Sequence, residues 1–581
     1  MTEPNPATVW ANIFVEEVAK HGIHSVCIAP GSRSTPLTLA FSNHADIQVY
    51  SHLDERSAAY FALGRSKYTG LPTPVVCTSG TAGANMYPAV IEASNGNVPL
   101  LFCTADRPPE LHDSGANQTI NQTNLYGDHV RWFKGLSEPS LSDNKLKSFR
   151  TTVAQAISQA INPPPGPVHL NFPFPKPFEP HGHDQETDIK RHEDNTQRRE
   201  EYVRVEETVS TISKARVHSI ADEIIDADRG FIVCGPQDPF RSYTDQITTL
   251  SHQIGFPILA DPLSNVRFSQ KESSAAILGG YDSYLVPPIS SELASPDIVL
   301  RFGLSPTSKT LRNYLSQVST TQYIINPSGE WNEANFSATH LVGAHPEWLV
   351  DTLTSILDSP ARTEWNALLS LEQQYRDLLA KEDRYFEGNI AKTALERLPK
   401  DAVLFVSNSM PVRDVDRFCL PHNTTLTTVG NRGASGIDGI TSTALGVGSA
   451  TNSDLVLLTG DLAYYHDMNG LVALDRCDVD TTIIEINNDG GGIFHKLPIE
   501  EYDPPFTSLF KTPHGLDFEA TGDLYDLSFV RVSSLTQLTE QLDKALTAEG
   551  SHVIETTVDA EESHRIRERL QSTVISTLSP K

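Results

Sequence analysis

The sequence predicts an α/β protein of three domains, each a doubly wound parallel sheet with helices on both faces. Two observations support this prediction. Short apolar runs alternate with helix-like stretches along the whole chain, which is typical of parallel strands joined by helical crossovers. The chain also has 581 residues, too many for one ordinary hydrophobic core and suited to about three domains.

The first predicted domain covers residues 1–183. Its strand-like runs are SVCIAP, TPVVCTSG, VPLLFCTAD and PVHLNFP, each short, apolar and bounded by turn residues. A proline-rich stretch, NPPPGPVHLNFPFPKPFEP, closes the domain. The polar stretch that follows has no periodicity, so we expect an exposed linker over residues 184–204.

Two further domains follow the same pattern. Residues 205–360 contain the runs GFIVCGP, FPILAD, DIVLRFG and QYIINP, and we expect this middle domain to be architectural. Residues 361–392 are predicted to be a helical linker that includes EWNALLSLEQQYRDLLAKE. Residues 393–581 form the third domain, with the runs VLFVSN, TTLTTVG, DLVLLTGD, TTIIEINN and HVIETTV.

Composition favours a soluble cytoplasmic protein. No apolar run is long enough to span a bilayer, and MTEPNPATVWANIF lacks the parts of a secretory signal. The net charge of −28 excludes nucleic acid as a partner. That charge fits either adaptation to high salt or an ordinary acidic cytosolic protein. Six cysteines without a CxxC pair are expected to be buried free thiols.

Two strand ends in the third domain predict a metal site. The run DLVLLTGD ends in Asp461 and the run TTIIEINN ends in Asn488, with room between them for a helix and a returning strand. We therefore expect both side chains at the carboxyl ends of strands, where open α/β sheets bind ligands. Mg²⁺ prefers oxygen ligands. Asp461 offers a carboxylate, Asn488 an amide oxygen and Gly490 a backbone carbonyl.

This GD…NN pattern resembles the diphosphate-binding motif of thiamine diphosphate-dependent enzymes, although Leu462 stands where many members have a small residue. Within that class the chain resembles the MenD family, the 2-succinyl-5-enolpyruvyl-6-hydroxy-3-cyclohexene-1-carboxylate synthases of menaquinone biosynthesis. The resemblance covers the first and third domains densely and the middle domain thinly. It is carried by APGSRSTPL, SHLDERSAAYFALG, TSGTA, TADRPPELHDSGANQTINQ, NRGASGIDG, GDLAYYHDMNG and NNDGGGIFHKLP.

The resemblance implies a thiamine diphosphate-binding fold, with a pyrimidine-binding first domain and a diphosphate-binding third domain. It implies thiamine diphosphate and Mg²⁺ as cofactors, with Mn²⁺ as a substitute, and a homodimer or homotetramer. The implied reaction is decarboxylation of 2-oxoglutarate and 1,4-addition of the succinyl carbanion equivalent to isochorismate. Its products are CO₂ and the compound for which the family is named. No nucleic acid or membrane partner is implied.

The acidic run before SAAYFALG has two interpretations. Asp54 and Glu55 are typical of a helix start, where carboxylates complement the exposed N–H groups. In the family that the chain resembles, a glutamate at this position protonates the pyrimidine ring of the cofactor. The resemblance therefore implies a catalytic role for Glu55 and a structural role for Asp54.

Two dianionic substrates require fixed cations, and guanidinium groups suit carboxylates best. Arginines follow four predicted strands, although a surface salt bridge is the alternative for any one of them. By family position, Ser32, Arg33, Arg107, Asn117 and Gln118 contact isochorismate and the adduct, and Ser409, Arg413 and Arg432 contact the 2-oxoglutarate portion.

The resemblance assigns the remaining site residues as follows. Ile437 is the apolar wedge under the cofactor, and ordinary core packing is the alternative for it. Ser409 and Ile493 also contact the cofactor, and Ile493, Phe494 and Leu497 form an apolar wall beside the reacting centre. Lys309 of the middle domain contacts substrate; Thr310 stands where some relatives have an arginine, and Arg312 is the nearest substitute.

Three other functions remain open. The first is another thiamine diphosphate-dependent 2-keto acid decarboxylase or carboligase. The second is an inactive paralogue or cofactor-binding subunit, against which the presence of Glu55, Asp461 and Asn488 argues. The third is a nicotinamide or flavin enzyme using GFIVCGP, which lacks the GxGxxG fingerprint.

Overall fold

The computed structural model describes residues 5–180, 200–269, 276–357, 365–422 and 424–579. The chain divides into two compact units. Unit 1 consists of Met1–Thr208, Gly433–Thr451 and Asp467–Val479, and unit 2 of Val209–Arg432, Asn452–His466 and Asp480–Lys581. Residues 184–199 of the expected linker and residues 361–364 of the expected helical linker lie outside the described residues.

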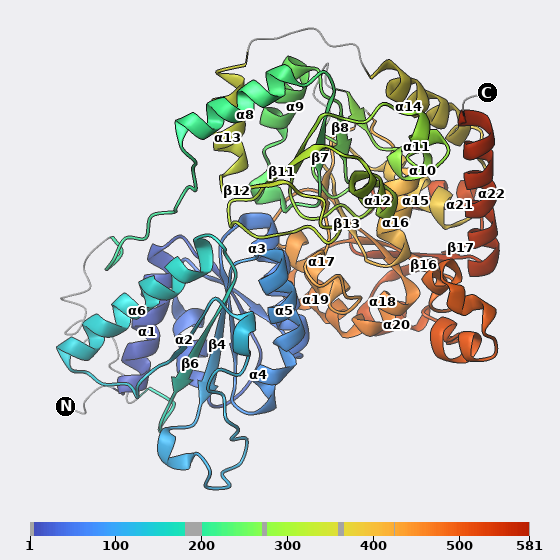
Figure 1. The fold of residues 1–581 in the computed structure, drawn as a ribbon. Coiled ribbons are helices and arrows are strands. Elements are labelled where there is room, and N and C mark those ends of the chain that lie inside the picture. Colours follow the sequence, from blue (N-terminus) through green and yellow to red (C-terminus); the bar gives the residue numbers. More distant parts are fainter. Residues whose placement is uncertain (1–4, 181–199, 270–275, 358–364, 423, 580–581) are drawn as a thin grey trace. The chain divides into compact units, whose positions relative to one another are not determined.

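Unit 1 is built on a six-stranded parallel sheet (Figure 1). Across it lie, in order, β2 (Gln48–Ser51), β1 (Ser25–Ile28), β3 (Thr73–Cys77), β4 (Leu100–Asp106), β6 (Pro167–Pro173) and β5 (Trp132–Gly135). The four central strands are buried along their whole length. Their sequences are continuous apolar runs because helices cover both faces of a parallel sheet.

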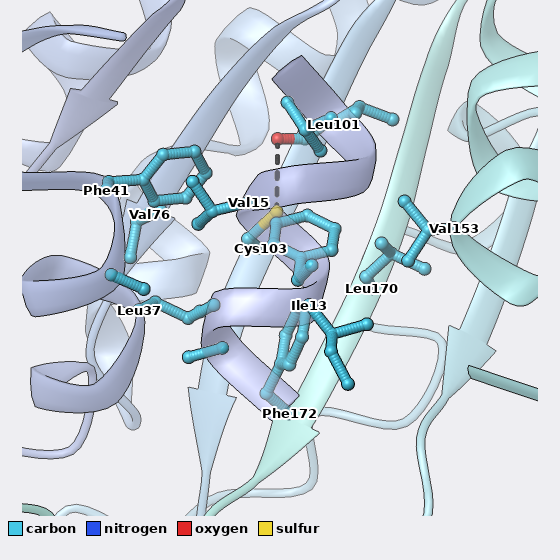
Figure 2. Packing of buried hydrophobic residues seen from close by; sticks show 14 of the residues in the cluster. Ile13, Val15, Leu37, Phe41, Val76, Leu101, Cys103, Val153, Leu170 and Phe172 are labelled. Carbon is cyan, nitrogen blue, oxygen red and sulfur yellow. Dashed lines mark hydrogen bonds between the residues drawn. The ribbon is translucent and has the colours of Figure 1, made fainter. Parts of the chain in front are cut away.

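One face of this sheet carries α1 (Pro6–Lys20), α2 (Thr35–Asn43) and α6 (Asp143–Ile161). Apolar side chains of the three helices interdigitate with those of the strands in one buried cluster (Figure 2). Burial of each large apolar side chain contributes roughly 1.5–3 kcal/mol, so this cluster is a main source of the unit's stability. It includes Ile13, Val15, Leu37, Phe41, Val76, Leu101, Cys103, Val153, Leu170 and Phe172.

The opposite face carries α3 (Glu55–Thr69), with α4 (Thr81–Asn85) and α5 (Tyr87–Gly96) beside it. α3 begins at a cap in which the Asp54 side chain accepts a hydrogen bond from the Arg56 amide at 2.8 Å. It lies between the sheet and α17 (Ile440–Gly448) of the same unit. Because α3 is covered on both sides, small residues recur along it, at Ser57, Ala58, Ala59, Ala62 and Gly64.

Unit 2 contains two further six-stranded parallel sheets (Figure 1). The middle sheet has the order β12 (His340–Val342), β11 (Thr321–Ile325), β10 (Ile298–Phe302), β7 (Gly230–Cys234), β8 (Ile258–Ala260) and β9 (Ile277–Leu278). One face packs on α8 (Lys214–Asp226), α9 (Thr244–Ile254) and α13 (Pro346–Thr354). The other packs on α10 (Tyr281–Tyr284), α11 (Ile289–Glu292), α12 (Lys309–Gln317), α14 (Asn366–Leu379) and α22 (Ala560–Leu578).

The last sheet has the order β14 (Thr427–Val429), β13 (Val403–Val406), β15 (Leu455–Gly460), β16 (Thr482–Asn487), β18 (His552–Thr557) and β17 (Ser528–Val532). α15 (Glu387–Arg397), α16 (Met410–Phe418) and α21 (Leu535–Ala545) share a core with it. The shorter helices α18 (Asp461–His466) and α20 (Ala520–Tyr525) also belong to unit 2, whereas α19 (Ala473–Cys477) belongs to unit 1.

The predicted fold class is confirmed. Each of the three sheets is six-stranded and all-parallel, with helices beside it, as expected for an α/β protein. All six cysteines are free and buried, in agreement with the sequence-based expectation. In the described part of the chain, no helix combines the length and the apolar character needed to cross a membrane.

Candidate active site

Asp461 and Asn488 follow two adjacent strands of the last sheet. β15 pairs with β16 in parallel, with Gly460 opposite Ile486, so both side chains lie at the same edge of the sheet. The Asp461 carboxylate is 3% exposed and accepts hydrogen bonds from the Gly490 amide at 2.8 Å and the Leu462 amide at 2.7 Å. Burial raises the pKa of Asp461, which marks a carboxylate that a cation could stabilise.

The Asn488 side chain, just after β16, has an amide oxygen without a hydrogen-bond partner among the described residues. This Oδ1 is buried, while Nδ2 donates to Glu387 Oε1 at 2.6 Å. Gly490 has φ +128, and a Cβ there would lie 2.0 Å from the Lys511 carbonyl oxygen, so only glycine fits. A buried carboxylate, an unpaired amide oxygen and a tight backbone turn fit a hard divalent cation.

His514 is a neighbour of this group that the sequence did not reveal. Its Nε2 lies 3.1 Å from Asp461 Oδ2, and its backbone N–H donates to Asp489 Oδ1 at 2.9 Å. The residue is separated from Asp461 by 53 positions, and nothing in the local sequence signals the contact.

The segment after β16 carries the three predicted apolar wall residues. Ile493 and Phe494 are partly buried in the turn Gly492–Lys496. The Phe494 ring packs edge-on against Phe510 at 5.7 Å. Leu497 is 47% exposed. An apolar segment therefore begins directly beyond the oxygen donors.

Ser409, Arg413 and Arg432 gather beyond the ends of β13 and β14. Ser409 has φ +69 immediately before α16, a conformation that is strained for a residue with a side chain. The Arg413 guanidinium donates to the Ser409 carbonyl oxygen, and Arg432 donates to Asn408 Oδ1 at 2.7 Å. Burial and the neighbouring charge of Arg432 lower the pKa of Arg413. Two cations held this close favour an anionic ligand.

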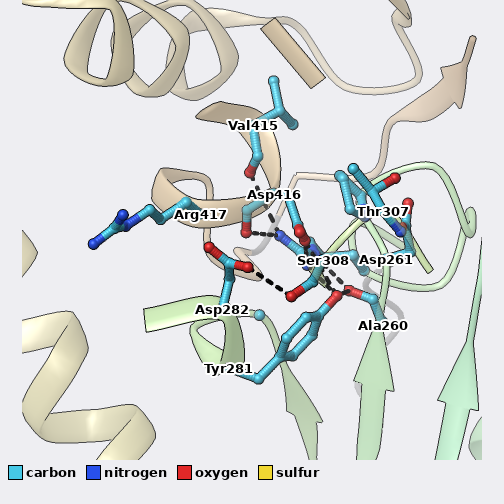
Figure 3. A network of polar contacts seen from close by, with 12 residues as sticks. Ala260, Asp261, Tyr281, Asp282, Thr307, Ser308, Val415, Asp416 and Arg417 are labelled. Atoms are coloured by element: carbon cyan, nitrogen blue, oxygen red, sulfur yellow. Dashed lines mark hydrogen bonds and ion pairs between the residues drawn. The ribbon is translucent and has the colours of Figure 1, made fainter. Parts of the chain in front are cut away.

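A buried arginine, Arg267, joins α16 to the middle sheet through Asp416 and Ala260, both of which are labelled in Figure 3. Arg267 is fully buried, and it donates to the Ala260 carbonyl oxygen at 2.6 Å and to Asp416 Oδ1 at 2.7 Å. It also donates to the hydroxyl of Tyr281 at 2.8 Å. These contacts position the helix that carries Arg413. Arg267, Ala260 and Tyr281 belong to the middle domain, which we expected to be architectural.

Lys309 begins α12 on the middle domain. The preceding Ser308 caps this helix, accepting from the Leu311 amide at 3.0 Å, and donates to Asp282 Oδ1 at 2.6 Å (Figure 3). Lys309 itself is exposed. The charge of Arg312, one turn further, contributes to the lowered pKa of Arg413. Arg312 therefore adds positive charge near Arg413, whereas Thr310 has no charge to contribute.

The predicted residues of unit 1 form a second basic group. Arg33 is 6% exposed, donates to the Phe174 carbonyl oxygen at 2.6 Å and lies over the Phe178 ring at 4.4 Å. Burial and the charge of Arg107 lower the pKa of Arg33. Arg107 donates to the hydroxyl of Ser79. The structure thus brings the two guanidinium groups near each other.

Three predicted polar residues border this basic group. Ser32 precedes Arg33 and is exposed, as are Asn117 and Gln118. Gln118 has φ +51, and its backbone lies 3.4 Å from the position of a Cβ at Gly80. Because Gly80 follows Ser79, the partner of Arg107, Gln118 lies close to the same strand end.

Glu55 and Ile437 also belong to unit 1. Glu55 is the first residue of α3, partly buried, and its carboxylate has no hydrogen bond or ion pair within the described residues. Ile437 is partly buried and precedes Asp438, whose carboxylate accepts a hydrogen bond from the Tyr60 hydroxyl of α3 at 2.5 Å. The loop of Ile437 is therefore tied to the helix that Glu55 begins.

Two polar partners of the site lay beyond sequence reasoning. Glu387 holds the amide of Asn488, and Arg567 of α22 pairs with Glu387. A glutamate at the start of a helix is an ordinary sequence feature, and the two residues are 180 positions apart. The one available signal was Asn488 itself, because an amide whose oxygen binds a cation needs an acceptor for its NH₂ group.

Comparison with known proteins gives three family matches along the chain. The N-terminal TPP binding domain of thiamine pyrophosphate enzymes matches residues 9–125, the middle domain residues 191–406 and the C-terminal TPP binding domain residues 414–556. The predicted metal ligands Asp461 and Asn488 lie within the third match, and Glu55 lies within the first.

Individual relatives match over nearly the full chain. A protein of Haloquadratum walsbyi is 51% identical and one of Haloarcula marismortui 48% identical, each over 100% of both chains. A protein of Roseiflexus sp. is 40% identical over 95% of both chains. All three are named 2-succinyl-5-enolpyruvyl-6-hydroxy-3-cyclohexene-1-carboxylate synthase.

Proposed function

Because the chain belongs to the 2-succinyl-5-enolpyruvyl-6-hydroxy-3-cyclohexene-1-carboxylate synthase family of thiamine pyrophosphate enzymes, we propose that it catalyses that synthesis in menaquinone biosynthesis. The proposed reaction decarboxylates 2-oxoglutarate and adds the remaining succinyl carbanion equivalent to isochorismate in 1,4-fashion, with release of CO₂. The observation that carries the proposal is the pair of oxygen donors, Asp461 and Asn488, at two adjacent strand ends.

The proposed metal is Mg²⁺, for which Mn²⁺ can substitute. Asp461, Asn488 and the backbone of Gly490 would hold it, and through it the cofactor's diphosphate. The unpaired Asn488 Oδ1 and the buried Asp461 carboxylate support this assignment. When bound, thiamine diphosphate supplies the electron sink that makes decarboxylation possible.

Glu55 is the proposed catalytic carboxyl. Its role would be to hold a proton against the pyrimidine nitrogen of the cofactor. In the described residues no cation or hydrogen-bond donor competes for this carboxylate. Ile437, whose loop is tied to α3 through Asp438 and Tyr60, is the proposed apolar support under the cofactor, with Ser409 and Ile493 as further contacts.

The basic groups are proposed to bind the substrate carboxylates. Ser409, Arg413 and Arg432 would bind the 2-oxoglutarate portion, because burial and the neighbouring charge of Arg432 lower the pKa of Arg413, a cation that an anion would stabilise. Ser32, Arg33, Arg107, Asn117 and Gln118 would bind isochorismate and the adduct, with Lys309 as a further contact. Phe494 and Leu497 would exclude water from the reacting centre.

We also propose that the enzyme is cytoplasmic and works as a homodimer or homotetramer. Support comes from apolar side chains that remain exposed on the segment beyond the metal ligands. Leu497 is 47% exposed, Tyr502 64% and Leu509 71%. Apolar side chains exposed in succession suit coverage by another chain.

The proposal is tested with purified protein after removal and return of thiamine diphosphate and Mg²⁺. We expect CO₂ release from 2-oxoglutarate to require isochorismate, and mass spectrometry to detect the named product. Both should disappear without the cofactor and return with it. Efficient turnover of pyruvate, or CO₂ release that is indifferent to isochorismate, would instead indicate another 2-keto acid decarboxylase or carboligase.

A further inference from the structure

We propose that Glu387 and Arg567 are positioning residues of the metal site, because they determine which atom of the Asn488 side chain faces the cation. The inference rests on the metal site proposed above. It concerns three residues, of which one directly follows β16 and the others belong to α15 and α22, all within unit 2.

The first step is the contact between Asn488 and Glu387. Asn488 Nδ2 donates to Glu387 Oε1 at 2.6 Å, and Asn488 Oδ1 is buried without a hydrogen-bond partner in the described part of the chain. A primary amide has donors on its nitrogen and lone pairs on its oxygen. An acceptor that holds the nitrogen therefore turns the oxygen to the other side, where a cation can use it.

The second step is the contact between Glu387 and Arg567. Both are nearly fully buried, at 2% and 5% exposed, and the Arg567 guanidinium donates to Glu387 Oε2. The same guanidinium forms a two-pronged contact with Asp414, at 2.9 Å from Nε and 2.7 Å from Nη2. A guanidinium has donors only. It therefore meets Glu387 as a donor, and the Glu387 Oε2 atom accepts.

The direction of donation is thus fixed along the chain of contacts. Arg567 donates to Glu387, Glu387 accepts from Asn488, and the Asn488 oxygen has no hydrogen-bond partner within the described chain. Gly492 leaves room for this arrangement, because a Cβ there would lie 2.5 Å from Asn488 Nδ2.

The neighbouring asparagine shows that a carboxylate partner alone does not make a cation ligand. Asn487 Nδ2 donates to Glu555 Oε1 at 2.8 Å, which repeats the contact of Asn488. Its Oδ1, however, already accepts from the Asp489 amide at 3.1 Å. Of the two asparagines, Asn488 is the one whose amide oxygen remains without a hydrogen-bond partner in the described residues.

The variant Glu387→Gln tests the fixed direction of donation. The new amide must turn its oxygen to Arg567, which has only donors, so its NH₂ group faces the NH₂ of Asn488. Asn488 then has to rotate and present nitrogen to the cation. We expect the affinity for Mn²⁺ to fall by about 10–100-fold, the usual effect of losing a residue that orients a metal ligand.

The measurement is a titration with Mn²⁺ in the presence of saturating thiamine diphosphate, followed by the EPR signal of free Mn²⁺. Asp414→Asn is the matched control. It removes one negative charge from the same buried group, but it leaves the contact between Glu387 and Asn488 in place. We expect this control to bind Mn²⁺ within about two-fold of the native chain, since the orienting contact survives.

A compensating substitution separates positioning from a general structural role. In Glu387→Gln combined with Asn488→Asp, one aspartate oxygen accepts from the new amide and the other faces the cation. The net charge is that of the native chain. We expect Mn²⁺ affinity to return to within about five-fold of the native value, which a purely structural role for Glu387 would not produce.

Each outcome decides between the two levels of the proposal. Failure of the native chain to bind Mn²⁺ would overturn the metal site and this inference with it. Native binding that is unchanged in Glu387→Gln would overturn the inference alone. If Glu387→Gln fails to fold, the double variant decides the question. A folded double variant that binds Mn²⁺ supports the inference, and a folded double variant that does not bind Mn²⁺ overturns it.

Discussion

Gly64 of α3 and Gly446 of α17 bring the two helices into direct backbone contact. A Cβ at Gly64 would lie 2.0 Å from the Thr443 carbonyl oxygen, and one at Gly446 would lie 2.0 Å from the Phe61 carbonyl oxygen. This contact explains the small residues of SAAYFALG. It also connects the helix that starts at Glu55 with the helix that follows the loop of Ile437.

The first prediction concerns this helix contact. Gly64→Ala should lower the free energy of unfolding by about 1–3 kcal/mol because the methyl group forces the backbones apart. Helix propensity alone would favour alanine by about 1 kcal/mol, so a loss identifies the contact as the cause. Gly343→Ala, where a Cβ meets nothing within 4 Å, is the control, and chemical denaturation measures both. Unchanged stability of Gly64→Ala would contradict the close contact.

The fold was predictable where strands are buried on both faces. β4, β7, β10 and β15 are continuous apolar runs, and sequence reasoning found each of them. β5, β9, β12 and β17 escaped it, and all four are edge strands of their sheets. An edge strand is half exposed, so its sequence, such as SFVRV, mixes polar and apolar residues and carries little signal.

The candidate site was predictable for a similar reason. Asp461 and Asn488 stand at the ends of apolar runs, and parallel strands bring such ends together. The partners of Asn488, Glu387 and Arg567, come from distant segments of the chain. Local sequence does not encode such packing, so these features required the structure.

The second prediction concerns the proposed cation ligand. Asp461→Asn should weaken the binding of thiamine diphosphate in the presence of Mg²⁺ by at least about 100-fold, since the proposed cation loses its carboxylate ligand. Calorimetry measures the affinity. The control for the loss of a nearby charge is Asp489→Asn. This variant removes an exposed carboxylate two positions before Gly491. Equal cofactor affinity in Asp461→Asn and the native chain would exclude Asp461 as a ligand.

The third prediction concerns Glu55. Glu55→Gln should lower kcat by about 10²–10⁴-fold, because glutamine cannot transfer a proton to the cofactor ring. Thiamine diphosphate should still bind, because the proposed metal ligands are intact. Steady-state kinetics and a cofactor titration measure the two effects separately. Asp54→Asn, at the helix cap, serves as the control; full activity of the Glu55 variant would remove this residue from the proposed mechanism.

The fourth prediction assigns the two basic groups to different substrates. Arg413→Lys should raise the KM for 2-oxoglutarate by about 10–100-fold, the cost of losing a two-pronged contact to a carboxylate, with little effect on isochorismate. Arg107→Lys should raise the KM for isochorismate by a similar factor, with little effect on the KM for 2-oxoglutarate. Each variant is the control for the other. If both variants raise the same KM, the assignment of the two groups is wrong.

The last prediction concerns the pH dependence of stability and the buried Asp467. Its carboxylate accepts hydrogen bonds from the amide and hydroxyl of Ser442, at 2.6 and 3.0 Å. Burial raises the pKa of Asp467 to about 6. The folded chain thus holds this proton more tightly than the unfolded chain, so the stabilisation is complete at low pH and is lost as pH rises through about 6.

Asp467→Asn should remove this dependence, because the asparagine oxygen can accept from the Ser442 amide while its NH₂ donates to the Ser442 hydroxyl. As pH rises from 4 to 7.5, the free energy of unfolding of the variant should increase by up to about 3 kcal/mol relative to that of the native chain. Chemical denaturation across that range measures it. Asp517→Asn is the control: a hydrogen bond from the Glu519 amide lowers the pKa of Asp517, so this carboxyl titrates below the range and the difference between variant and native chain should stay nearly constant across it. A constant difference between native chain and Asp467→Asn would show that Asp467 is ionised throughout.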